Sequence, residues 1–115
     1  MRIVDRQTFL SLPENTVYSI SHWNPEGGST AITDLYIKGP TVADADYYET
    51  AIPSFDFNSI EEMSAEIERS LSRGWSVDPD FGVETRNSMF DENQMFAVWE
   101  KEDIERLIAR LNECL

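Results

Sequence analysis

The sequence predicts an α+β domain with a largely antiparallel sheet of about four or five strands, covered by two main helices. Strand-like segments near residues 16–20, 31–38 and 46–52 follow one another with turn residues between them, which favours antiparallel pairing. Two later segments, residues 60–73 and 102–113, repeat apolar residues at the helical period. The order β-α-β-β-β-α-β-α is typical of this class. The length of 115 residues predicts a single globular domain over residues 1–115.

The N-terminal half should contain a short strand, a short helix and a hairpin. Residues 2–4 can form a strand, and Asp5 can cap a helix over residues 6–12 that Pro13 stops. Residues 16–20 and 31–38 are the predicted hairpin strands, with a turn over 24–29 and with Gly39-Pro40 closing the second strand. Residues 46–52 form the next strand, which ends at Pro53.

The C-terminal half should contain both main helices. Ser59 and Glu62 match a capping box at the start of the helix over 60–73, and Gly74 is placed to end it. Residues 75–86 are irregular. The apolar strand over 94–100 leads into the helix over 102–113. We expect Phe96 and Leu107 to lie in the core.

Acidic side chains dominate the chain and are concentrated in its middle. Nine Lys and Arg residues against 22 Asp and Glu give a formal net charge of −13, which disfavours direct binding to nucleic acid. Residues 41–68 contain eight carboxylates and no Lys or Arg. These charges must repel one another over about 10 Å at physiological salt. Such repulsion costs stability and tends to persist where a partner needs the field. A solvated surface that only aids solubility explains the same composition.

The residue types that usually perform catalysis do not form a recognisable set. His22 and Cys114 are the single histidine and the single cysteine, and neither has a nucleophile or an orienting acid at a known spacing. The carboxylates of Asp78, Asp80 and Glu84 lack the glycine and glutamate spacing of an EF-hand, and a turn explains them. We therefore expect no enzyme activity, no metal and no cofactor.

Three segments carry a resemblance to a known group of proteins. They are Phe9–Glu14 (FLSLPE), Tyr36–Gly39 (YIKG) and Phe90–Ile108 (FDENQMFAVWEKEDIERLI). The chain resembles small phage and prophage accessory proteins with the pattern F-L-x-L-P-x-G-T, then I-K-G, then L-F-D-D-x-Q-L-F-A-V-Y-E-K-E-D-V-x-x-L-I. Asn15 stands where that pattern has Gly. The resemblance implies a small intracellular protein that acts against a host factor, and it implies no catalytic residue.

Charge and resemblance together favour an interaction protein, resembling an anti-CRISPR or anti-restriction inhibitor, that occupies the nucleic-acid-binding surface of a basic host protein. The expected contact residues are Asp44, Asp46, Tyr48, Glu49, Asp56, Glu61, Glu62 and Glu66. Replacing Asp44, Asp46, Glu49, Glu62 and Glu66 by Asn or Gln should leave the fold intact. One alternative is a phage protein that sequesters a small molecule or nucleotide, and another is a structural accessory protein. In each case we expect the host cytoplasm and no membrane association.

Overall fold

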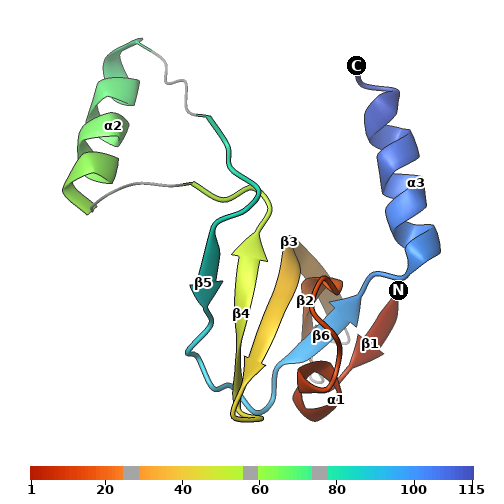
Figure 1. The fold of residues 1–115 in the computed structure, drawn as a ribbon. Coiled ribbons are helices and arrows are strands. Elements are labelled where there is room, and N and C mark those ends of the chain that lie inside the picture. The colour runs from red at the N-terminus through yellow and green to blue at the C-terminus, as the bar shows by residue number, and fades with distance from the viewer. Residues whose placement is uncertain (25–28, 56–59, 74–77) are drawn as a thin grey trace.

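The computed structural model describes residues 1–24, 29–55, 60–73 and 78–115, and these form an α+β structure (Figure 1). Within them, six strands make one antiparallel sheet in the order β1-β6-β2-β3-β4-β5. The strands are β1 (Arg2–Val4), β2 (Val17–Asn24), β3 (Ser29–Val42), β4 (Asp46–Ala51), β5 (Glu84–Arg86) and β6 (Met95–Val98). The helices are α1 (Arg6–Leu10), α2 (Ile60–Arg73) and α3 (Lys101–Asn112). The predicted α+β class and antiparallel pairing are confirmed.

A cluster of aromatic rings holds α1 on the sheet. The Phe9 ring of α1 lies parallel to the Phe96 ring of β6, with 3.9 Å between the ring centroids. Tyr18 of β2 and Tyr47 of β4 meet Phe9 edge-on at 4.6 and 4.9 Å. All four residues are fully buried. This cluster joins α1 to three strands, and it confirms that Phe96 is a core residue.

Local sequence signals set the start of α1 and the turn that follows it. The Asp5 carboxylate accepts a hydrogen bond from the Thr8 backbone N–H at 2.8 Å and caps the helix as predicted. Asn15 has a φ of 66°, in the left-handed region that glycine and asparagine reach most easily. An asparagine therefore supplies the conformation that a glycine at this position would supply.

The sheet has more strands than the four or five expected, and β3 is longer. The strand β3 does not close at Gly39-Pro40 but continues to Val42, and its register with β4 shifts between Lys38 and Thr41. Such an irregularity admits Pro40, which has no N–H for the ladder. Residues 84–86, expected to be irregular, form the additional edge strand β5 on β4.

The helices α2 and α3 lie where the sequence predicts them, but they do not cover the sheet. Figure 1 shows both helices beyond one end of the sheet, on opposite sides of it, while α1 packs on the sheet itself. No residue of α3 is buried, and Leu107 is only half-buried. The expectation that Leu107 lies in the core is therefore wrong. The Ser59 cap and Gly74 lie outside the described residues.

Substitution by alanine can test the different burial of Phe96 and Leu107. Phe96→Ala should lower the free energy of unfolding by about 3–5 kcal/mol, because it removes the ring stacked on Phe9. Leu107→Ala should cost less than about 1 kcal/mol, since the side chain remains partly in water. Urea denaturation of both variants would test this. Equal losses would show that α3 packs on the core after all.

Candidate functional site

The expected contact residues do not form one surface. Asp44 is exposed in the turn between β3 and β4, and Glu61 and Glu62 are exposed on α2. Figure 1 places this turn and α2 at opposite ends of the sheet. Glu66 of α2 is half-buried and pairs with Arg69 at 2.8 Å. Asp56 lies outside the described residues.

Asp46 lies inside the fold instead of on the surface. Its side chain is fully buried, and one carboxylate oxygen accepts a hydrogen bond from Nε of Arg86 at 2.6 Å. The same carboxylate accepts the backbone N–H of Ser88. Burial by itself would raise the pKa of Asp46, but the hydrogen bonds from Arg86 and from backbone N–H groups outweigh it, so the pKa lies below its usual value.

Glu49 also has an internal role. Its carboxylate accepts hydrogen bonds from the hydroxyl of Tyr18 at 2.5 Å and from the side-chain amide of Asn87 at 3.2 Å. The backbone N–H of Asn87 in turn donates to the carbonyl of Tyr47 at 3.0 Å. Tyr48 points to the other side of the strand and is half-buried. The acids of β4 thus fasten residues 86–88 to the sheet.

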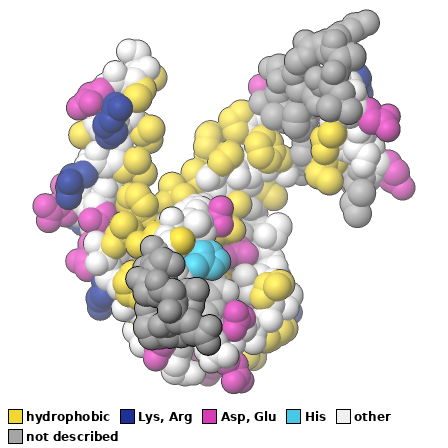
Figure 2. All heavy atoms as spheres, turned by 180° about the vertical axis from the view of Figure 1, so that it is seen from behind, with side chains coloured by type: hydrophobic (Ala, Val, Ile, Leu, Met, Phe, Trp, Pro, Cys, Tyr) yellow, Lys and Arg dark blue, Asp and Glu magenta, His cyan; other side chains and the backbone are white. Residues whose placement is uncertain are grey.

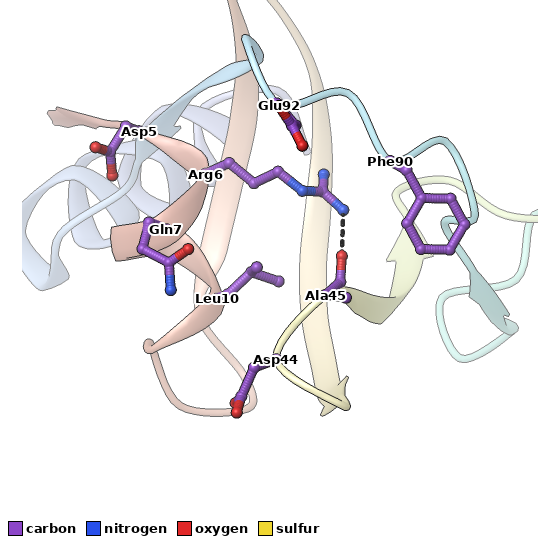
Figure 3. A pocket seen from close by; sticks show the side chains of 8 residues that line it. All are labelled: Asp5, Arg6, Gln7, Leu10, Asp44, Ala45, Phe90 and Glu92. Carbon is purple, nitrogen blue, oxygen red and sulfur yellow. Dashed lines mark hydrogen bonds between the residues drawn. The ribbon is translucent and has the colours of Figure 1, made fainter.

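The segment that these acids hold leads into a pocket. The pocket has a volume of about 430 Å³ and lies between α1, the β3–β4 turn and the segment before β6 (Figure 3). It is lined by Asp5, Arg6, Gln7, Leu10, Asp44, Ala45, Phe90 and Glu92. Of these eight residues, only Asp44 is among the expected contact residues. The other residues come from segments whose approach no sequence spacing indicates.

Arg6 forms one wall of the pocket and is buried. One terminal nitrogen, Nη2, donates to the carbonyl of Ala45 at 2.7 Å, and the guanidinium lies 5.6 Å from the centre of the Tyr47 ring. The other terminal nitrogen, Nη1, is buried and has no hydrogen-bond partner among the described residues. Arg6 thus ties α1 to the β3–β4 turn. Three acids line the same pocket, so its net charge remains negative.

Several residues around the pocket have unfavourable backbone conformations. Ala43 and Asp44 in the turn have φ values of 52° and 55°, and Ser88 and Phe90 have values of 59° and 52°. Positive φ is costly for residues with a Cβ, above all for a bulky aromatic residue. Phe90 is nevertheless 52 % exposed. The fold therefore holds a large apolar ring at the pocket in a strained conformation, as binding sites often do.

Apart from the pocket, acidic side chains form a row on α2. Glu61, Glu62 and Glu68 are exposed, and Met63 and Ile67 have 37 % and 43 % of their surface in water. Figure 2 shows acidic side chains on the side of this helix that faces away from the rest of the molecule. The surface combines charge with apolar side chains, but it lacks the enclosure of the pocket.

The residues considered as catalysts or metal ligands have simple structural surroundings. His22 is exposed, with Nε2 3.0 Å from the hydroxyl of Thr33, and Cys114 is exposed on the segment after α3. Asp80 accepts the N–H of Gly82 at 2.8 Å in the turn that the sequence predicts. Among the described residues, no group of three or more His, Cys, Asp and Glu is placed to hold a metal ion.

Comparison with known proteins adds no functional assignment. No family model matches the sequence, and neither the curated proteins nor the solved structures give a significant match. Within the described ranges, no helix has the length and apolar character needed to cross a membrane.

The role of Asp46 can be tested against its exposed neighbour. Asp46→Asn should lower the free energy of unfolding by about 1–3 kcal/mol at pH 7, because Arg86 and Ser88 lose a charged acceptor. Asp44→Asn should change it by less than about 0.5 kcal/mol, since Asp44 is exposed and asparagine tolerates the same φ.

The pH dependence of the free energy of unfolding gives a second test of the role of Asp46. A lowered pKa in the folded state stabilises the fold above the unfolded value of 3.8, and this stabilisation is lost as the pH falls through the folded value. Urea denaturation of the parent and of Asp46→Asn should therefore converge as the pH falls below 3.8. An unchanged difference in stability at acid pH would contradict the assigned role.

Proposed function

We propose that this chain is a small acidic interaction protein that binds a basic partner protein, with the pocket around Phe90 as the principal contact. The observation that supports it is the exposed side chain of Phe90, a residue with positive φ, in the lining of the same pocket as the carboxylates of Asp44 and Glu92. Carboxylates attract Lys and Arg side chains, and an aromatic face adds a cation–π contact of about 0.5–2 kcal/mol. The favoured ligand is a Lys or Arg side chain of the partner.

The buried guanidinium of Arg6 is compatible with a peptide ligand. A bare cation near Arg6 would meet repulsion from its positive charge, whereas a peptide carries carbonyl acceptors beside its cationic side chains. Arg6 is buried and donates to the carbonyl of Ala45, whereas Asp44 and Glu92, which line the same pocket, are exposed (Figure 3). A Lys or Arg side chain that enters from solvent therefore meets carboxylates first.

The acidic row of α2 would extend the attraction beyond the pocket. Complementary charge raises association rates more than affinity, so Glu61, Glu62 and Glu68 would act mainly by steering a basic protein toward the molecule. In the context that the phage resemblance implies, such a partner is a nucleic-acid-binding host factor that this chain inhibits. A pocket with three acids and one Arg does not favour a nucleotide, which argues against the sequestering alternative.

A synthetic peptide rich in lysine and arginine can test the pocket by isothermal titration calorimetry. Phe90→Ala should weaken binding about fivefold, which corresponds to the loss of about 1 kcal/mol of cation–π and apolar contact. The double variant Asp44→Asn, Glu92→Gln should weaken it about tenfold at low salt, and less at about 200 mM salt because screening already reduces the attraction. Neither variant alters Asp46 or Glu49, whose hydrogen bonds fasten residues 86–88 to the sheet.

A matched control separates the pocket from overall charge. The double variant Glu102→Gln, Glu105→Gln removes the same two charges from exposed positions on α3. It should bind the peptide within about twofold of the parent at physiological salt. Equal weakening by both double variants would show that only net charge matters. An unaffected Phe90→Ala variant would exclude the pocket as the contact.

A further inference from the structure

The apolar stripe of α3 is exposed along the helix. Ile108 is 54 % exposed and Leu111 is 57 % exposed. Figure 2 shows hydrophobic side chains along one side of this helix, facing the open space between α3 and α2. We propose that a second copy of this chain covers the stripe, with α3 packed antiparallel against the α3 of its partner.

A helix of this length needs a packing partner. Isolated helices of about 12 residues are marginal in water, and most helix stability in proteins comes from burying an apolar face. Within the chain, α3 is held at one flank, where Asp103 pairs with the N-terminal amine at 2.7 Å and Leu107 lines a pocket with Trp99. At 100° per residue, Ile104, Ile108 and Leu111 lie beside Leu107 but further from this flank. The second side of the stripe is the side left for a partner.

Charge indicates which partner fits. The chain carries a net charge of −13, so most of its surfaces would repel a second copy. The helix α3 is an exception, because Lys101, Arg106 and Arg110 balance Glu102, Asp103 and Glu105. A neutral apolar stripe on a strongly acidic chain is where two copies can approach at the smallest electrostatic cost.

The distribution of these charges along α3 favours the antiparallel arrangement. Its first five residues contain one base and three acids, and the rest of the helix contains Arg106 and Arg110 with no acid before the C-cap residue Glu113. An antiparallel two-fold pair places each acidic half beside the basic half of the other copy, and it also opposes the two helix dipoles. A parallel pair would place like charges together.

The size of the contact sets the expected affinity. A 12-residue helix is about 18 Å long and about 10 Å wide, so an α3 pair alone buries less than the roughly 1,000 Å² of a strong interface. We therefore expect a weak dimer, with a dissociation constant on the order of 10 µM. Figure 1 places the α1 side of the sheet and the β3–β4 turn away from α3, so the dimer would leave the basic-peptide pocket open. Failure of peptide binding would not affect this inference.

Sedimentation velocity over about 1 µM to 1 mM protein tests the dimer at physiological salt. The parent should pass from monomer to dimer, and Ile108→Lys should raise the dissociation constant at least tenfold. The control Ile32→Lys makes the same change at an apolar residue of β3 that is 43 % exposed, and it should dimerise like the parent. A parent that stays monomeric would overturn the proposal, also where α2 covers the stripe of α3 within one chain. Equal effects of the two variants on dimerisation would overturn it as well.

Cysteine crosslinking tests how the two helices are arranged in the dimer. In a Cys114→Ser background, Ile108→Cys near the middle of α3 should form a disulfide-linked dimer under mild oxidation by oxidised glutathione. Glu102→Cys lies on the opposite side of the helix from the stripe and should not. Leu111→Cys should crosslink poorly, because antiparallel pairing separates its two copies along the axis. Crosslinking at Leu111 as fast as at Ile108 would overturn the antiparallel geometry, and crosslinking at Glu102 would overturn the interface.

Discussion

The stack of Phe9 on Phe96 is the contact on which both the core and the pocket depend. The helix α1 has only five residues, too few to be stable without tertiary contacts. The Phe9 ring, at 3.9 Å from Phe96, fixes α1 on the sheet. Because Arg6 lies three residues earlier, the same contact brings its guanidinium to the carbonyl of Ala45. One aromatic contact thus sets a wall of the pocket as well as the centre of the core.

The acidic composition conceals two different uses of carboxylates. Asp46 and Glu49 are acceptors inside the fold, and their hydrogen bonds hold the segment that ends at Phe90. Their effect on binding would be indirect, through the position of that ring. Asp44 and Glu92 lie at the pocket and can act on a partner directly. Neutralising all acids of residues 41–68 at once would therefore damage the fold and the surface together.

Local signals predicted most elements, and long-range contacts account for the differences. The Asp5 cap and the apolar periods of α2 and α3 act within a few residues, so they can be read from the sequence. The three residues of β5 carry no strong pattern, and they form a strand because β4 offers a free edge. An amphipathic stripe indicates that a helix packs one face against another element, but it does not indicate which element or which chain. We expected α3 to pack on the sheet, whereas in the structure α3 lies beyond one end of the sheet.

The pocket was beyond prediction for a related reason. Its residues come from α1, the β3–β4 turn and the segment before β6, which the sheet order β1-β6-β2-β3-β4 brings together. The positive φ of Phe90 has no sequence signature, since phenylalanine rarely adopts it. Two copies paired through α3 would carry two such pockets on one particle. A partner with repeated basic segments could then engage both, and linked binding of this kind raises the apparent affinity by orders of magnitude without any new contact. Modest single-site affinity is thus compatible with tight binding to the basic partner proposed above.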